Sequence, residues 1–255
     1  MAELAEKLWH ARLNGSVVDP ADVTEPDGTE ASYAVQQRIV ALSGHPVIGF
    51  KVGSTSTEAQ RILGTEEPGS GALMAPYHHT SPARVAIVPG HMPAIEGEFA
   101  FRLGRDLPPR QEDYSYDEVR DAIDAVAGAV EIVGTRIAGG LVGKGRFLVT
   151  ADGGANIALV TGAWQEDWRA MDLKAHHVAV SINGQAGGSG EGAHALGDPM
   201  NVMVWLAAQQ SRFGRGLKAG DIVSTGTCTG IDAVKPGDDV VADYGSLGRV
   251  EFSCQ

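Results

Sequence analysis

The chain has 255 residues, with 20 basic and 32 acidic side chains and a formal charge of −12. This length suffices for one large domain, or for one domain with a smaller appended piece. The negative charge argues against nucleic-acid binding, because no basic stripe is present to neutralise phosphates. A small anionic substrate remains compatible with it, since such a substrate needs only a local cation, and a bound metal ion can supply one.

The composition favours a β-rich globular body, because the 34 glycines indicate many tight turns. No apolar run is long enough to cross a membrane, and residues 1–15 lack an apolar core of signal-peptide length. We therefore expect a cytoplasmic protein that binds no membrane. Cys228 and Cys254 are not spaced as a metal-ligand pair, and free thiols are favoured over a disulfide.

The first part of the chain is expected to be helical. Apolar residues at helical spacing predict helices over 2–13 and 30–42, which form an N-terminal layer. A short strand is predicted over 47–52. Thr55 and Glu58 then fit a capping box, so a further helix is predicted from there to residue 63.

The middle of the chain combines a loop with a helix. Residues 66–93 are rich in turn-forming residues and predict a loop with one short strand, 85–88. Apolar residues at helical spacing predict a helix over 116–128, whose end runs into an apolar strand over 129–133.

From residue 147 to the end, the sequence predicts mainly strands joined by turns, with an Asn183-Gly184 hairpin. One helix interrupts them, over 200–213, with Asp198 as its N-cap. The whole predicts an α+β fold, in which residues 1–90 form a helical or cap region and residues 91–255 a β-rich catalytic body. The two regions can also form one continuous domain.

The segment 92–103, MPAIEGEFAFRL, is the most informative one. Strand side chains alternate between faces, so Glu96 and Glu98 share one face while Ile95, Phe99 and Phe101 enter a core on the other. Two residues of rise hold the carboxylates roughly 7 Å apart. At an effective dielectric of 20, two anions at that distance repel by about 2 kcal/mol. We therefore expect a cation nearby, and a hard divalent ion satisfies both carboxylates.

Two further charged residues lie in apolar strands. Glu131 is either paired with Arg136 or Lys51, or is a third metal ligand beside Glu96 and Glu98. Three carboxylates without histidine select Mg²⁺ or Mn²⁺ over zinc. Lys51 either extends to the surface or points into a site as charge stabiliser or general base, and the adjacent glycine and hydroxyl side chains favour a site.

A second candidate binding segment is the run of residues 224–230, STGTCTG. Gly226 permits a close backbone approach to a ligand, and the hydroxyl of Thr225 or Thr227 is able to hydrogen-bond a carboxylate. A tight turn without a ligand is equally consistent with this segment. Ser54 and Thr55, which follow the Lys51 strand, complete the candidate substrate-binding residues.

Five segments in the same order resemble the fumarylacetoacetate hydrolase superfamily, and within it the branch of 2-keto-4-pentenoate hydratases and 4-oxalocrotonate decarboxylases: 49–56, 95–107, 129–137, 183–207 and 217–238. The resemblance implies metal-binding carboxylates at Glu96, Glu98 and Glu131 and an active-site lysine at Lys51. It also implies a mixed β-roll or sandwich body with peripheral helices, and a homo-oligomer.

The resemblance implies a lyase that acts on 2-oxo or 2-hydroxy-dienoic acids and needs Mg²⁺ or Mn²⁺, with hydration of 2-hydroxypenta-2,4-dienoate as the leading expectation. The alternatives are a decarboxylase of an oxalocrotonate-type diacid, a C–C hydrolase of acylpyruvates, and a metal-binding protein without turnover. The chain departs from the hydratase pattern in 71–80, which lacks a carboxylate, and in 151–156, where Gly153 follows Asp152. The decarboxylase requires an extra cationic pocket for its second carboxylate.

Overall fold

The structure is a computed structural model that describes residues 1–255 apart from the side chain of Ile62. The α-helices are α1 (Ala2–Asn14), α2 (Thr29–Ser43), α3 (Thr57–Leu63), α4 (Tyr116–Ala122), α5 (Arg146–Ala151) and α6 (Pro199–Phe213). Among the described residues, no helix combines the length and the apolar character that crossing a membrane requires.

Two mixed sheets form the body. The larger, eight-stranded sheet contains β1 (Val47–Gly53), β2 (Gly69–Met74), β3 (His78–Thr80), β5 (Ala94–Leu103), β6 (Ile123–Val133), β7 (Asn156–Thr161), β10 (Ile222–Ser224) and β11 (Asp232–Ala233). The five-stranded sheet contains β4 (Ala83–Val85), β8 (His177–Ile182), β9 (Gln185–Glu191), β12 (Asp239–Asp243) and β13 (Arg249–Cys254). The larger sheet takes strands from both of the regions suggested by the sequence, 1–90 and 91–255.

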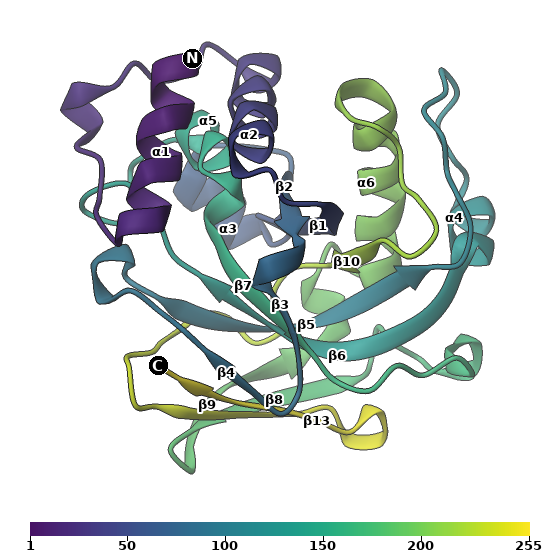
Figure 1. Ribbon diagram of the computed structural model, residues 1–255. Helices are drawn as coiled ribbons and strands as arrows, with labels where there is room; N and C mark the ends of the chain where they lie inside the picture. Colours follow the sequence, from purple (N-terminus) through teal and green to yellow (C-terminus); the bar gives the residue numbers. More distant parts are fainter.

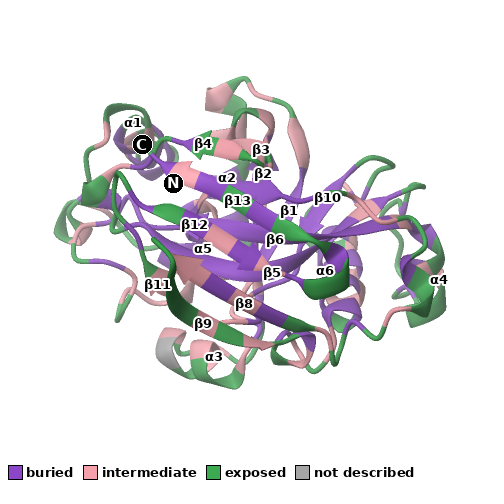
Figure 2. Cartoon of the chain, turned by 90° about the horizontal axis from the view of Figure 1, so that it is seen from below, coloured by how far each residue is buried: buried purple, intermediate pink, exposed green. Residues whose placement is uncertain are grey.

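The sheets and helices form three layers, with the larger sheet in the middle (Figure 1). The helices α1, α2, α3 and α5 lie on one side of it and the smaller sheet on the other, whereas α4 and α6 join the main core with the smaller sheet. Between the sheets, the main core packs Phe99 and Phe101 of β5 against apolar residues of the smaller sheet such as Val178. Figure 2 shows β5 and β6 buried along most of their length, which makes the centre of this sheet a protected place for polar groups.

The N-terminal helices were predicted to within two residues and pack through a core of their own with α5, around Leu8, Val35 and Leu148. The prediction of the Asn183-Gly184 hairpin is also confirmed. Ile182 pairs with Gln185 across a two-residue turn in which both central residues have positive φ. At α6, the Asp198 side chain accepts a hydrogen bond from the Met200 amide, as expected of an N-cap.

The predicted helix over 116–128 is wrong in its second half. The helix α4 ends at Ala122, and β6 runs from Ile123 without a break to Val133. Pairing with β5 along this whole length overrides the local helical spacing, as tertiary context often does. Gly128 lies against the Tyr244 ring, where an added Cβ would come within 2.4 Å of a ring carbon.

The predicted loop over 66–93 is wrong as well, because it contains β2, β3 and β4. The strand β2 pairs with β1, β3 with β7, and β4 with β13. Because β7 and β13 lie far away in the chain, the local sequence does not predict these pairings. The predicted strand 85–88 overlaps β4 only at Val85.

Two helix predictions need correction. The helix α3 begins one residue later than expected, with Ser56 and not Thr55 as its N-cap, because the Thr55 side chain is buried against Gly226. The helix α5 lies where strands were expected, because Leu148 and Ala151 pack into the N-terminal helical core.

Cys228 and Cys254 are both buried free thiols, as predicted.

Candidate active site and metal centre

The register of β5 and β6 brings the three predicted carboxylates together. Glu96 lies directly opposite Glu131 in the antiparallel ladder, and Glu98 lies two residues further along β5 on the same face. This face is the one opposite Phe99 and Phe101, which belong to the main core, and residues of α3 and α5 lie beside it. Like charges directly opposite each other destabilise a sheet, so the arrangement calls for a compensating cation.

The three carboxylates are close together and withdrawn from water. One oxygen of each lies within 4.8 Å of one oxygen of each of the others. Glu98 and Glu131 are 0% exposed and Glu96 is 8% exposed. Burial, together with the charge of Glu131, raises the pKa of Glu96 to about 7, and the same two causes raise the pKa of Glu98 well above its ordinary value.

Only some of the carboxylate oxygens have partners. Glu98 Oε2 accepts hydrogen bonds from the Ser224 hydroxyl and from the Gly226 amide, the latter at 2.9 Å. Glu131 Oε1 accepts one from Asn156 Nδ2 at 2.8 Å. Glu98 Oε1 and Glu131 Oε2 are buried without a hydrogen-bond donor, which is costly for a carboxylate unless a cation lies beside it.

Lys51 lies inside the site and does not extend to the surface. Its Nζ lies 3.2 Å from Glu131 Oε2, an ion-pair distance without an aligned hydrogen bond, and donates to the Gly154 carbonyl at 2.9 Å. Burial by itself lowers the pKa of the ammonium, but Glu131, Glu96 and Glu98 outweigh it and raise the pKa. Glu131 therefore pairs with Lys51 and also lies with the other two glutamates, and its role as a third metal ligand stays a prediction.

A cavity of about 220 Å³ opens beside this cluster. Glu96, Lys51 and Ser54 line it together with apolar side chains, among them Leu63, Val133, Leu141, Val149 and Ile231. Arg146, at the start of α5, also lines it and donates to the Thr65 hydroxyl at 2.9 Å. The cavity therefore combines charged groups with walls that suit a short carbon chain.

The predicted substrate-binding residues are distributed unevenly around this cavity. Ser54 lines it, in a left-handed conformation with φ 57°. The other four do not line it. The Thr55 side chain packs against Gly226, whose amide donates a hydrogen bond to Glu98. The Thr225 hydroxyl donates to the Phe99 carbonyl, and the Thr227 hydroxyl donates to the Gly230 carbonyl within the same turn.

Sequence reasoning missed three residues of the site. Asn156 holds Glu131, Ser224 holds Glu98, and Arg146 lines the cavity. Ser224 begins the run of hydroxyl and glycine residues that the sequence singled out, so its position was a usable signal. Asn156 ends the segment that departs from the hydratase pattern, whereas nothing local distinguishes Arg146.

The donor set fits a hard divalent ion. Glu96, Glu98 and Glu131 are the one group of metal-ligand side chains that converges in this way within the described part of the chain. Glu98 Oε1 is buried without a donor and is available as a ligand, and Glu131 Oε2 has Lys51 Nζ as its one charged neighbour, at 3.2 Å. Carboxylate oxygens are the preferred ligands of Mg²⁺ and Mn²⁺, so the residues fit the predicted metal.

Metal affinity should depend on pH. Since the pKa of Glu96 is about 7 in the metal-free protein, a proton occupies this ligand at lower pH and competes with the ion. We expect Mn²⁺ to bind more weakly at pH 6 than at pH 8, with release of protons on binding. Calorimetric titrations in buffers of different ionisation enthalpy measure both quantities, and an affinity that does not change with pH would contradict the assignment of Glu96.

Comparisons with known proteins find a matching family model, relatives and solved structures. The family model described as fumarylacetoacetate (FAA) hydrolase C-terminal matches residues 49–254. Over 258 residues the chain is 36% identical to a 2-keto-4-pentenoate hydratase of Paraburkholderia xenovorans (strain LB400), covering 98% of this chain and 94% of the relative. Over 256 residues it is 30% identical to a 2-hydroxyhexa-2,4-dienoate hydratase of Comamonas testosteroni, covering 97% and 96%.

Among solved structures, the chain is similar to the 4-oxalocrotonate decarboxylase from Pseudomonas putida G7 complexed with magnesium and adipate. The TM-score is 0.89 at 27% identity, and the likeness covers 100% of this chain and 97% of the other. The predicted α+β fold with a mixed β-roll or sandwich body is confirmed by this likeness.

Proposed function

Because the chain belongs to the fumarylacetoacetate hydrolase family, we propose that it is a divalent-metal-dependent hydratase that converts 2-hydroxypenta-2,4-dienoate into 4-hydroxy-2-oxopentanoate. One observation carries the proposal: three buried glutamates converge beside a buried lysine at the end of an apolar cavity. The hydratase names of the curated relatives support this choice of reaction.

Glu96, Glu98 and Glu131 would hold the Mg²⁺ or Mn²⁺ ion. A bound ion would supply positive charge that stabilises the negative charge developing on the 2-oxygen of a 2-oxo acid. The magnesium in the similar decarboxylase structure supports the choice of a hard ion. Gly226 and Ser224 keep Glu98 in place, and Asn156 does so for Glu131.

Lys51 is the proposed catalytic residue. An ammonium has three N–H donors. One is used by the Gly154 carbonyl and a second side faces Glu131, so a donor remains for a ligand in the cavity that Lys51 lines. Lys51 is charged because its pKa is raised. Its Nζ is therefore able to stabilise an enolate oxygen or to pass a proton to the adjacent carbon after water has added.

The cavity wall suits the rest of the substrate. We propose that the Ser54 hydroxyl contacts the substrate carboxylate, while Thr55, Thr225, Gly226 and Thr227 shape the wall behind it. The apolar side chains that line the cavity accept the diene and exclude bulk water from the reacting carbons. A single water molecule for the addition must then enter with the substrate.

Decarboxylation of an oxalocrotonate-type diacid is the second candidate, and one observation favours it. Arg146 lines the same cavity as Lys51 and supplies the additional cation that a second carboxylate needs. Its pairing with Glu67 is loose, at 3.9 Å, so its charge remains available. The structural likeness to a decarboxylase complexed with the diacid adipate agrees with this reading.

One assay separates the candidates. Purified protein with Mg²⁺ is incubated with 2-hydroxypenta-2,4-dienoate, the ultraviolet absorbance of the dienol is followed, and the products are identified by NMR. Loss of the dienol with formation of 4-hydroxy-2-oxopentanoate is the expected result. Release of carbon dioxide from oxalocrotonate would favour the decarboxylase, and cleavage of acylpyruvates the hydrolase. No reaction with any of these acids would contradict an enzymatic function.

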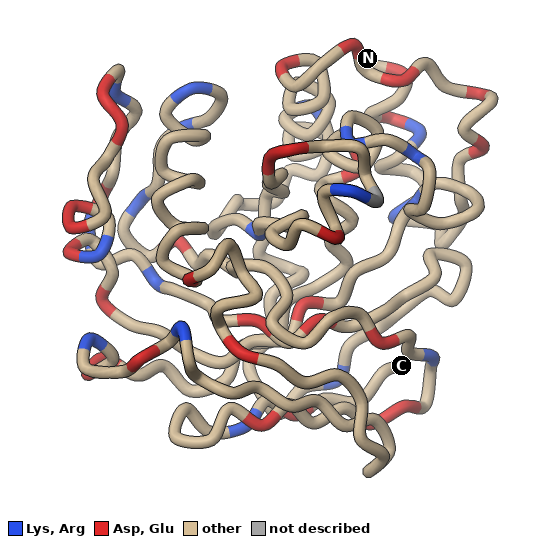
Figure 3. The backbone as a smooth tube through the Cα atoms, turned by 180° about the vertical axis from the view of Figure 1, so that it is seen from behind, with Lys and Arg blue, Asp and Glu red and all other residues tan. Residues whose placement is uncertain are grey.

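We also propose a homo-oligomer in the cytoplasm that recognises small anionic 2-oxo acids and no nucleic acid. The charge distribution supports the last point, because Lys and Arg are scattered among more numerous Asp and Glu (Figure 3). Sedimentation analysis of the purified protein tests the oligomer, and a monomer at working concentration would contradict it.

A further inference from the structure

A short segment behind the site holds two of its key side chains. In the segment 152–156, the Gly154 carbonyl accepts a hydrogen bond from Lys51, and the Asn156 side chain donates to Glu131. The ion pair between Lys51 and Glu131 is therefore held from both sides by residues only two positions apart. Any movement of this segment moves both partners relative to Glu96 and Glu98.

The segment has a backbone that requires outside support. Gly153, Gly154 and Ala155 are three successive residues with positive φ, at 67°, 64° and 65°. This conformation costs free energy for alanine, and glycine leaves it readily. The close approach of β2 limits movement on one side, since a Cβ at Gly71 would lie 2.1 Å from the Gly153 carbonyl oxygen.

Arg136 supports the segment at both ends. Its Nε donates to the Asp152 carboxylate at 2.7 Å, and its backbone amide donates to the same carboxylate at 2.9 Å. One guanidinium N–H also donates to the Asn156 carbonyl at 2.8 Å. Arg136 and Asp152 are both buried, at 3% and 1% exposed, so these hydrogen bonds are shielded from water.

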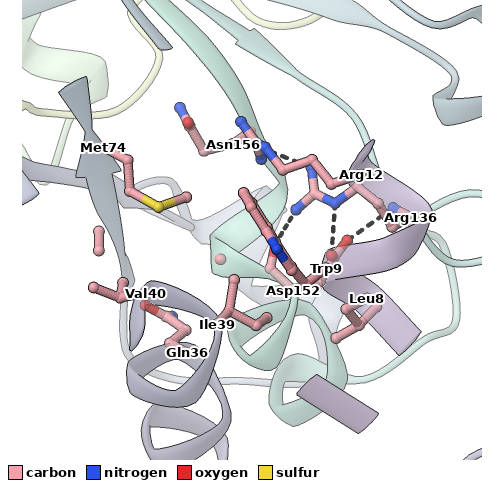
Figure 4. A pocket seen from close by; sticks show the side chains of 12 residues that line it. Leu8, Trp9, Arg12, Gln36, Ile39, Val40, Met74, Arg136, Asp152 and Asn156 are labelled. Carbon is pink, nitrogen blue, oxygen red and sulfur yellow. Dashed lines mark hydrogen bonds and ion pairs between the residues drawn. The ribbon is translucent and has the colours of Figure 1, made fainter. Parts of the chain in front are cut away.

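Arg12 reaches the same place from the N-terminal helix α1. Its guanidinium donates to the Asn156 carbonyl at 2.8 Å and to the Ile157 carbonyl at 2.6 Å, and it lies over the Tyr77 ring at 3.7 Å. Figure 4 shows Arg12 and Arg136 converging on Asp152 and Asn156. Two guanidinium groups thus share one carbonyl oxygen, which fixes the end of the segment next to the Asn156 side chain.

We propose that Arg12 and Arg136 are positioning residues of the active site, which clamp the segment 152–156 and so hold Lys51 and Glu131 in place for metal binding and turnover. This inference rests on the proposed function, because it assigns a role toward the metal held by the three glutamates. It makes the N-terminal helix part of the support of the site, although no residue of α1 lines the cavity beside Glu96.

The test uses Arg12→Met, which keeps an apolar stem over Tyr77 but removes the donors. Binding of Mn²⁺ to the metal-free protein is measured by the electron paramagnetic resonance signal of the free ion. Changes in residues that orient metal ligands typically weaken metal binding by about 10- to 100-fold, and we expect a loss of about tenfold. In the assay of the proposed reaction, kcat should fall more than KM, and Arg12→Lys should restore part of both losses.

Arg169→Met is the matched control. Arg169 also donates to a backbone carbonyl, that of Ile123, at 2.8 Å and lies over an aromatic ring, that of Trp168. Its partner Ile123 lies at the opposite end of β6 from Glu131. If the two variants lower the unfolding temperature similarly and only Arg12→Met weakens Mn²⁺ binding, the clamp is supported.

Unchanged Mn²⁺ affinity of folded Arg12→Met would overturn the clamp and leave Arg12 a structural role only. Should that variant fail to fold, Arg12→Lys provides the same test, because lysine keeps the charge but loses the planar pair of donors. Its affinity should then lie below that of the original protein, and equal affinity would overturn the clamp. Absence of Mn²⁺ binding by the original protein would contradict the proposed metal site itself.

Discussion

Glu98→Gln is expected to weaken Mg²⁺ and Mn²⁺ binding by more than about 100-fold. Mutations of residues that only orient a metal ligand lower metal affinity by up to about 100-fold, and the loss of a ligand's charge should exceed that. Glu98 is fully buried, one of its oxygens has no hydrogen-bond donor, and the other accepts from Ser224 and Gly226. Glutamine keeps the shape and one carbonyl oxygen but removes the negative charge. Isothermal titration calorimetry at pH 8 measures the loss.

The metal-free variant should remain folded. Burial and the neighbouring glutamates raise the pKa of Glu98 well above its ordinary value, so this position disfavours a negative charge in the metal-free protein. We therefore expect the unfolding temperature of metal-free Glu98→Gln to equal or exceed that of the original protein at pH 8. Glu251→Gln, an exposed change on β13, serves as the control. Equal metal affinity of Glu98→Gln and this control would count against Glu98 as a ligand.

The alternation of β5 explains why much of the site could be predicted. Glu96 and Glu98 share a strand face, and Phe99 and Phe101 identify the other face as a core face, so the position of both carboxylates followed from strand geometry alone. The buried lysine was visible in the same way, as a charge within an apolar strand. Whether Glu131 joins this site depended on the register between β5 and β6, and local sequence does not encode that register directly.

The wrong predictions have a common physical cause. The segment 123–128 has helical spacing, but pairing with β5 decides its conformation. The strands β2, β3 and β4 lie among turn-forming residues and gain their stability largely from partners elsewhere in the chain. In each case non-local hydrogen bonds outweigh local preference.

The supporting residues were hidden for the same reason. Asn156 and Arg12 lie 144 positions apart in the chain and meet only because α1 packs over the end of β7. Arg146 reaches the cavity because α5 packs with the N-terminal helices. A residue whose role depends on such a contact has no local pattern that would identify it.

Lys51→Met is expected to abolish turnover while sparing metal binding. If Lys51 stabilises or protonates the enolate, its removal should lower kcat by about 10²- to 10⁴-fold, the usual contribution of a positioned proton donor. Methionine is an unbranched replacement that keeps most of the Lys51 stem, which packs closely against Gly71 and Gly154.

The effect on metal affinity distinguishes this role from that of a ligand. The charge of Lys51 lowers the pKa of Glu131 and Glu96, and it also neutralises part of the charge available to a metal ion. Removal of this charge should raise the pKa values of Glu131 and Glu96 further, so that protons compete more strongly with the metal ion for these carboxylates at pH 6. At pH 8 competition by protons is weaker, and Mn²⁺ should bind at least as tightly as before because the ammonium no longer opposes it.

Paired measurements of Mn²⁺ affinity and kcat at pH 8 test this division of roles, with Lys174→Met as a control at an exposed lysine. Full activity of Lys51→Met would leave Lys51 with the structural role of neutralising Glu131. A large loss of metal affinity at pH 8 would instead mean that Lys51 keeps the glutamates in their binding geometry, and that the ion pair, rather than the ammonium alone, is what the reaction requires.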